Sequence, residues 1–205
     1  MIPVIILISY LVGSIPWGLV LGKLSGVDVR KSGSGNIGAT NVSRLLGKKL
    51  GLLTLMGDIA KGVLPMVLAA HFFRDHQLLD IIVPACGFAA FLGHLYPVYL
   101  RFRGGKGVAT ALGVFLYLEP LAILGDLVVF VFVVAIWGYV SLGSLVASAA
   151  IPLLIWILGG SADHMILAAL IAALIWVKHH ENIRRLLNHQ EKSWKKAPQD
   201  QAGGK

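Results

Sequence analysis

The stretch 108–140 reads VATALGVFLYLEPLAILGDLVVFVFVVAIWGYV, and its only charged residues are Glu119 and Asp126. A membrane-spanning helix needs about 20 predominantly apolar residues. The stretch is long enough for more than one such helix. Leu118-Glu119-Pro120 marks the break between two helices, because proline disrupts a helix that runs through it. The stretch therefore predicts an integral membrane protein.

The rest of the chain has the same character. Four further apolar runs lie at 2–21, 52–70, 81–100 and 142–177. Hydrophobic residues make up 57% of the 205 residues and charged residues 14%, whereas soluble domains carry about 25% charged residues. The loops between the runs are too short to bury a second core. We therefore expect one transmembrane domain over 1–189, followed by a polar, basic C-terminal tail over 190–205.

The predicted fold is an all-α polytopic membrane protein with about seven transmembrane helices. Five helices are the alternative, because dividing 108–178 in four leaves only about 18 residues for each span. The seven predicted spans are 2–22, 51–70, 80–100, 108–122, 124–140, 142–159 and 163–178.

Positive charge is confined to a few segments. The segments 23–50, 101–107 and 178–205 contain 6, 3 and 7 Lys and Arg residues, which together make 16 of the 18 in the chain. Cytoplasmic loops of membrane proteins are enriched in Lys and Arg. This pattern predicts that all three segments are cytoplasmic, with the N-terminus outside, the C-terminus inside and an odd number of spans.

The formal net charge of +8 does not indicate a nucleic-acid-binding protein, because the basic residues flank apolar spans and no aromatic-basic module accompanies them. Anionic lipid headgroups and phosphorylated small molecules are the better partners. Cys86 is the only cysteine and has no neighbouring Cys/His cluster. We expect no metal and no cofactor.

The first polar motif is Gly33-Ser34-Gly35-Asn36-Ile37-Gly38-Ala39-Thr40-Asn41, followed by Arg44. Its glycines allow successive backbone N–H groups to turn toward one anion. Ser34, Asn36 and Thr40 add side-chain hydrogen bonds. If a helical turn begins at Thr40, Arg44 lies on the same face. The motif predicts a phosphate-binding loop.

The second motif is Arg101-Phe102-Arg103-Gly104-Gly105-Lys106-Gly107. It resembles part of a nucleotide-binding P-loop, but Gly107 stands where Ser or Thr should follow the lysine, and no strand precedes it. We therefore expect no nucleotide. What remains is a glycine turn that presents Lys106 at the start of a helix, with Gly105 beside it.

The third motif is Lys178-His179-His180-Glu181-Asn182-Ile183-Arg184-Arg185, at the end of the last span. His179 and Asn182 are three residues apart and share a helix face, whereas His180 points elsewhere. Lys61 is a further candidate, because a charge inside a span requires a partner or a polar cavity. Asp58 lies three residues before it.

Three basic segments therefore converge on one face of an apolar bundle. This arrangement suits a site for phosphate groups beside an entry for a lipid chain. A soluble phosphorylated acceptor that meets an activated lipid fits best. A transporter for a phosphorylated anion is the alternative, and a non-catalytic lipid-binding scaffold is a third.

The runs GSGNIGATNVSRLLGKK, GHLYPVYLRFRGGKGVATALG and KHHENIRRLL resemble, in this order, the three motifs of the bacterial acyl-phosphate:glycerol-3-phosphate acyltransferases. The resemblance spans most of the chain. It implies transfer of an acyl group from a long-chain acyl phosphate to the sn-1 hydroxyl of glycerol 3-phosphate, giving 1-acylglycerol 3-phosphate and phosphate. This is the first step of phospholipid synthesis, at the bacterial cytoplasmic (inner) membrane with the active site facing the cytoplasm.

The resemblance also assigns roles to residues. His179 and Asn182 would face the glycerol hydroxyls, with either His179 or a substrate phosphate as the base, and Ser34 would join them in the catalytic group. The residues expected to bind substrate are Ser34, Gly35, Asn36, Thr40, Arg44, Lys61, Gly105 and Lys106. The partners are glycerol 3-phosphate, acyl phosphate and membrane lipids.

Overall fold

The structure is a computed structural model that describes residues 1–195. Within this range it is built from helices and contains no strand. The helices are α1 (Ile2–Gly13), α2 (Trp17–Leu24), α3 (Ala39–Leu46), α4 (Lys48–Phe72), α5 (Leu79–Leu95), the 3-10 helix η1 (Val98–Leu100), α6 (Val108–Leu118), α7 (Pro120–Trp137), α8 (Val140–Ile157), α9 (Ala162–Lys178) and α10 (His180–Leu187). Most of the predicted tail, residues 196–205, lies outside the described residues.

Several helix boundaries coincide with the predicted breaks. Glu119 is the single residue between α6 and α7, and Gly138 and Tyr139 separate α7 from α8. The first predicted span, 2–22, differs from the prediction, because it is broken into α1 and α2 with a bend of 41°. Pro16 lies at the break. Proline has no N–H to donate and disfavours a helical conformation of the residue before it, which favours a break at this position.

Among residues 1–195, four helices are long and apolar enough for each to cross a membrane, namely α4, α5 extended to Leu100, α7 and α8. The number rises to six if the bent pairs α1 with α2 and α9 with α10 each count as one span. Helix α6 is apolar but has only 11 residues. On α7 many large apolar side chains point outward, including Leu121, Val128 and Phe132, each at least 60% exposed. This outward apolar surface is typical of a helix that faces lipid.

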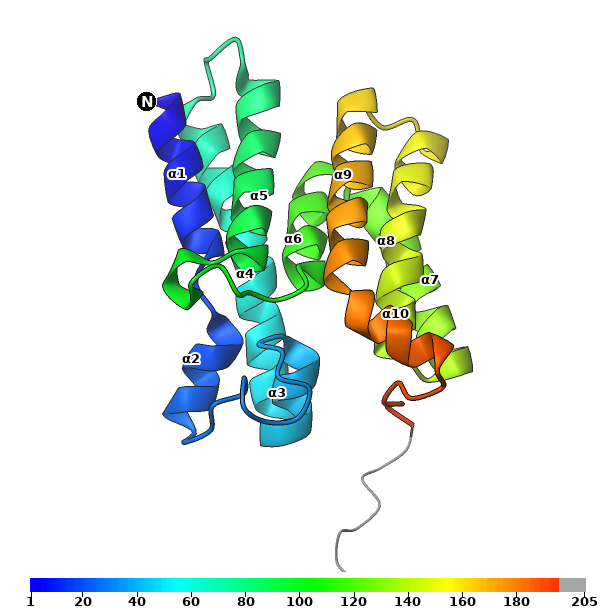
Figure 1. Cartoon of the computed structure of the whole chain (residues 1–205). Helices are drawn as coiled ribbons and strands as arrows, with labels where there is room; N and C mark the ends of the chain where they lie inside the picture. Colours follow the sequence, from blue (N-terminus) through cyan, green and yellow to red (C-terminus); the bar gives the residue numbers. More distant parts are fainter. Residues whose placement is uncertain (196–205) are drawn as a thin grey trace, which may run out of the picture.

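Small residues bring the helices into close contact. Gly13 of α1 lies against the backbone of Ala90 in α5, where any added Cβ would collide. Gly62 of α4 and Gly113 of α6 make the same kind of contact with each other's helix. Such close backbone approach drives helix association in membranes, where apolar burial alone provides no force. Helices α1, α4, α5 and α6 therefore form a first group. Helices α7, α8 and α9, which pack against one another in sequence order, form a second group, to the right in Figure 1.

The polar segments gather at one end of the bundle. Helices α2, α3 and α10 lie at the lower end of Figure 1, opposite the turns that join α4 to α5 and α8 to α9. The glycine loop 101–107 connects α5 to α6 on the side of the bundle that faces this end. The fold therefore places all three predicted motifs close together.

Candidate active site

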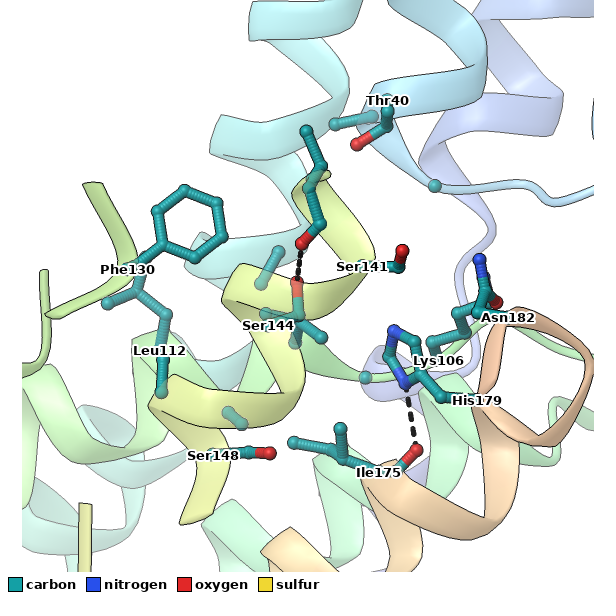
Figure 2. A pocket seen from close by; sticks show the side chains of 18 of the residues that line it. Thr40, Lys106, Leu112, Phe130, Ser141, Ser144, Ser148, Ile175, His179 and Asn182 are labelled. Atoms are coloured by element: carbon teal, nitrogen blue, oxygen red, sulfur yellow. Dashed lines mark hydrogen bonds between the residues drawn. The ribbon is translucent and has the colours of Figure 1, made fainter. Parts of the chain in front are cut away.

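A cavity of about 560 Å³, here called the inner cavity, lies where the two groups of helices meet. All three motifs contribute to its wall. The predicted site residues that line it are Ser34, Asn36, Thr40, Arg44, Lys106, His179 and Asn182. Figure 2 shows Thr40, Lys106, His179 and Asn182 around one region of this space.

A single side chain organises the first motif. The Asn41 amide accepts a hydrogen bond from the backbone N–H of Ser34 at 2.9 Å and donates to the carbonyl oxygens of Val29 (3.0 Å) and Asn36 (2.9 Å). Asn41 is 2% exposed. Gly33 has a φ of +67°, and a Cβ there would collide with the Asn41 side chain. Asn41 therefore holds the loop in a curve around itself, which leaves the Ser34 side chain facing the inner cavity.

Helix α3 follows this loop directly. It starts at Ala39 and contains both Thr40 and Arg44, so the predicted helical turn is confirmed. Thr40 lies in the first turn, where backbone N–H groups have no partner within the helix. Arg44 lies one turn later and lines the same cavity. A helix N-terminus and a guanidinium group therefore face the same space, a combination that favours anions.

The second motif packs on the end of α5. The N–H groups of Gly104 and Gly105 donate to the carbonyl oxygens of Leu95 (3.2 Å) and His94 (3.1 Å). A Cβ at Gly105 would collide with the His94 ring, so glycine is required there. The loop ends at Gly107, and α6 begins at Val108. This arrangement presents Lys106 at the start of a helix, as predicted.

The third motif begins where α9 ends. The chain bends by 62° between α9 and α10. His179 is 2% and Asn182 4% exposed, and both line the inner cavity. His180 is exposed and lines a different cavity. The predicted division of the two histidines between opposite faces is confirmed.

The second and third motifs contact each other directly. The Lys106 ammonium donates a hydrogen bond to the side-chain oxygen of Asn182. Burial lowers the pKa of Lys106 to about 8. Burial and the nearby Lys106 charge lower the pKa of His179 to about 4. At neutral pH Lys106 is therefore mainly charged and His179 is neutral.

The neutral His179 ring has a defined tautomer. Its Nδ1 lies 2.8 Å from the carbonyl oxygen of Ile175, the contact drawn as a dashed line in Figure 2. A carbonyl oxygen only accepts, so Nδ1 carries the proton and donates. Nε2 is then left as an acceptor, able to receive a hydrogen bond from a hydroxyl group.

Three predicted substrate-binding residues lie elsewhere. Gly35 and Gly105 line a second cavity of about 1110 Å³, which shares Asn36 and Lys106 with the first. Lys61 lies inside the helix bundle, with Nζ 2.9 Å from an Asp58 carboxylate oxygen and 2.9 Å from the carbonyl oxygen of Ile15. Its 3% exposed side chain has its charge satisfied by protein groups. Lys61 therefore lies behind Asp58, which does line the inner cavity.

Away from the three motifs, the wall of the inner cavity is mostly apolar, apart from Asp126 of α7 and the serines of α8. Leu112 and Phe115 of α6, Phe130 of α7, Ile151 of α8 and Ile171 of α9 line it. Leu112 and Phe130 lie away from Lys106 and Asn182 in Figure 2. One continuous space therefore joins a cationic, hydroxyl-bearing end to a mostly apolar end, which suits a ligand with a charged head and a hydrocarbon tail.

Sequence reasoning missed three residues of this site. Asn41 supports the first motif, and Ser141 and Glu191 line the inner cavity. Ser141, Ser144 and Ser148 form a polar stripe on α8, a spacing of three and four residues that was visible in the sequence. Glu191 was assigned to the tail, and no local pattern marks it.

Comparisons with known proteins agree with this geometry. Residues 3–189 match the family described as glycerol-3-phosphate acyltransferase. The glycerol-3-phosphate acyltransferase of Desulfotalea psychrophila is 57% identical over 190 residues, which cover 93% of this chain and 96% of that protein. The corresponding protein of Geotalea daltonii is 52% identical over 193 residues, covering 94% and 97%.

Solved structures are also similar. The crystal structure of PlsY (YgiH), an integral membrane glycerol 3-phosphate acyltransferase, in its glycerol 3-phosphate form has a TM-score of 0.87 and 41% identity, covering 94% of this chain and 95% of that one. Its lysophosphatidic acid form has a TM-score of 0.85 at the same identity. The chain, an all-helical multi-pass bacterial membrane protein, belongs to the glycerol-3-phosphate acyltransferase family.

Proposed function

We propose that the protein transfers an acyl group from a long-chain acyl phosphate to the sn-1 hydroxyl of glycerol 3-phosphate. The products are 1-acylglycerol 3-phosphate and inorganic phosphate. The observation that carries the proposal is the inner cavity, whose polar end is formed by all three motifs and whose other end is mostly apolar. The two PlsY structures, named for the acceptor and for the acylated product, support the same reaction.

The polar end has groups for both phosphates. The loop from Gly33 to Thr40 and the start of α3 suit the phosphate of the donor, while its alkyl chain lies along Leu112 and Phe130. Arg44 and Lys106 suit the phosphate of glycerol 3-phosphate. Asn182 and the free Nε2 of His179 then orient the glycerol hydroxyl, and Ser34 adds a hydroxyl group beside them. Gly35 and Gly105 contribute through the backbone conformation of the two glycine loops. Lys61 contributes by pairing with Asp58 and holding its carboxylate in place.

The chemistry needs little beyond these groups. The glycerol hydroxyl oxygen attacks the acyl carbon, the bond from that carbon to the phosphate oxygen breaks, and the hydroxyl proton moves to a phosphate oxygen. A phosphate group has a second pKa of about 6, above the pKa of about 4 of His179, so the phosphate is the stronger base. Because the donor already carries a good leaving group, proximity and charge stabilisation are the main requirements.

We further propose seven membrane crossings, with α1 and α2 together forming the first and α6 a short crossing of its own. The N-terminus is outside and the C-terminus is cytoplasmic, with the site facing the cytoplasm at the bacterial inner membrane. The confinement of 16 of 18 Lys and Arg residues to three segments supports this orientation.

The donor can be tested with purified protein and labelled glycerol 3-phosphate. Acyl phosphate and acyl-CoA are supplied separately, with a metal chelator present throughout. We expect labelled 1-acylglycerol 3-phosphate from acyl phosphate alone, with phosphate release that depends on the acceptor. Efficient turnover with acyl-CoA alone, or loss of activity with the chelator, would contradict the proposal. Uptake of label into sealed vesicles without a covalent product would indicate a transporter instead.

A further inference from the structure

The C-terminal strap, residues 190–195, folds back onto the site. The backbone N–H of Trp194 donates to the carbonyl oxygen of Gly138 at 2.9 Å, and the Ser193 hydroxyl donates to the same oxygen at 3.2 Å. Arg44 of the first motif donates to the carbonyl oxygen of Lys192 at 3.3 Å. The strap therefore joins the turn between α7 and α8 to α3, on opposite sides of the inner cavity.

The strap brings one carboxylate into the cavity wall. Glu191 Oε1 accepts hydrogen bonds from Asn182 Nδ2 at 2.7 Å and from the Ser141 hydroxyl at 2.8 Å. Glu191 Oε2 accepts from Arg185 Nε at 2.7 Å. The Glu191 side chain is 8% exposed. Three hydrogen-bond donors from α8 and α10 therefore hold this carboxylate in a fixed, buried position.

These contacts determine how Asn182 is oriented. An amide side chain has a donor end and an acceptor end of nearly the same shape, so only its hydrogen-bond partners select the orientation. Glu191 is a pure acceptor when ionised, and it therefore takes the NH₂ group of Asn182. The carbonyl oxygen must then face Lys106, the contact that the structure has.

We propose that Glu191 is a positioning residue of the acyl transfer. Its carboxylate fixes the amide of Asn182 with the oxygen toward Lys106, and it holds Asn182, Ser141 and Arg185 in their positions relative to one another. This inference rests on the proposed function. Glu191 lies beyond residue 189, the last that matches the family, and it touches no reacting atom in this arrangement. It acts through Asn182 and through the charge balance at Lys106.

The charge balance gives a second consequence. The charged groups that face Lys106 are Glu191 and Glu181, which raise its pKa, and Arg185 and Arg44, which lower it, while His179 lies beside it in neutral form. Removing the Glu191 charge lowers the pKa of Lys106 further. Because a protonated Lys106 binds phosphate, the fall of kcat/KM at alkaline pH must then begin at lower pH.

Two variants separate the hydrogen bond from the charge. We expect Glu191→Ala to lower kcat/KM for glycerol 3-phosphate by about 10- to 150-fold, because it leaves buried, partly charged partners unsatisfied. Glu191→Gln keeps an oxygen that can accept from Asn182 and Ser141, so we expect it to recover part of that loss. Both variants should move the alkaline limb to lower pH. A purely structural role for Glu191 would not produce this shift together with partial rescue.

The matched control is Glu181→Gln. Glu181 lies on α10, which also carries Asn182 and Arg185; its side chain is 70% exposed and has a carboxylate oxygen 3.8 Å from Arg185. Removing this exposed charge should change kcat/KM by less than about threefold. Size-exclusion profiles and thermal unfolding in detergent establish that each variant is folded.

The outcomes are distinct. Wild-type protein that forms no product from acyl phosphate contradicts the proposed function and leaves Glu191 without a role in it. Active wild-type protein with an equally active Glu191→Ala variant overturns the positioning role alone. A lower KM for glycerol 3-phosphate in Glu191→Ala also overturns it, because Glu191 would then be competing with the substrate phosphate.

Discussion

At the scale of single residues, the site depends on side chains that have two hydrogen-bonding groups, each with a different partner. His179 donates a hydrogen bond from its Nδ1–H group to the carbonyl oxygen of Ile175, which leaves Nε2 for a ligand. Asn41 uses both ends of its amide to shape a loop. Asn182 uses both ends to join Lys106 to Glu191. In each case a hydrogen bond to a neighbouring protein group fixes the orientation or the tautomer of the side chain.

The cationic residues make the first prediction. Arg44→Ala and Lys106→Ala each remove a charge-assisted contact to phosphate, which is worth about 1.5–3 kcal/mol. We expect each to lower kcat/KM by about 10- to 150-fold in the acyl-phosphate assay. Lys106→Arg should retain part of the activity and lose the alkaline limb near pH 8, because arginine stays protonated.

His180→Ala is the control for these variants. His180 is exposed on the other face of α10, and its Nδ1 lies 2.9 Å from the carbonyl oxygen of Val177, a backbone group. We expect a mild effect compared with His179→Ala. Equal losses for the two histidine variants would show that the faces of α10 are misassigned.

At the scale of helices, a buried charge cluster joins α4 to its neighbours. Asp58 and Lys61, each 3% exposed, pair at 2.9 Å within α4. Lys61 also donates to Ile15, at the break before α2. His94 of α5 lies 3.6 Å from Asp58 and packs against Gly105. The cluster therefore contacts, through His94, the loop 101–107 that presents Lys106.

This cluster makes the second prediction. Lys61→Met leaves the Asp58 carboxylate buried without its partner, which costs about 3–5 kcal/mol of unfolding free energy. The double variant Asp58→Asn with Lys61→Met removes both charges and should recover much of that loss. Unfolding titrations in detergent micelles give the coupling energy through a double-mutant cycle.

A surface ion pair provides the comparison. Arg74 and Asp75 lie 3.2 Å apart with side chains 75% and 89% exposed. Exposed pairs contribute little to stability, so Arg74→Ala should leave the unfolding free energy nearly unchanged. If the Lys61→Met variant were as stable as Arg74→Ala, the buried pair would not be what joins these helices.

At the scale of the whole molecule, the chain is asymmetric along the bundle. Helices α2, α3 and α10 lie at one end (Figure 1), and the two short turns lie at the other. This asymmetry supports the proposed arrangement, with phosphate groups at the charged end and the acyl chain along the apolar walls, because each part of a substrate is then in an environment that solvates it.

Sidedness makes the third prediction. In a Cys86→Ser background, single cysteines replace the exposed residues Gln77, Lys48, Arg103 and Asn188. An impermeant thiol reagent added to intact cells should label the Gln77 position alone, and the other three only after permeabilisation. In the loop 101–107 the exposed residue Arg103 is the suitable position, because a side chain at the buried Gly105 would collide with His94. Labelling of the Arg103 position from outside would contradict a cytoplasmic site.

Much of the fold and of the site could be predicted from the sequence. Long apolar runs, their proline and glycine breaks, the three motifs and the opposite faces of His179 and His180 are all local patterns. The partition of side chains between lipid and water acts on each segment separately, so such patterns carry over directly into helices and their boundaries.

Only the tertiary structure decided which distant residues meet. Ser141 and Glu191 are 50 residues apart and Lys106 and Asn182 are 76 apart, and nothing in either local sequence identifies the partner. Asp58 lies three residues before Lys61 in the sequence, whereas the second partner of Lys61, the carbonyl oxygen of Ile15, is 46 residues away and no local pattern identifies it. The sequence assigned Glu191 to a polar tail, whereas in the structure it lines the inner cavity. Hydropathy and charge determine where a segment lies relative to the membrane, whereas contacts between segments depend on how whole helices pack.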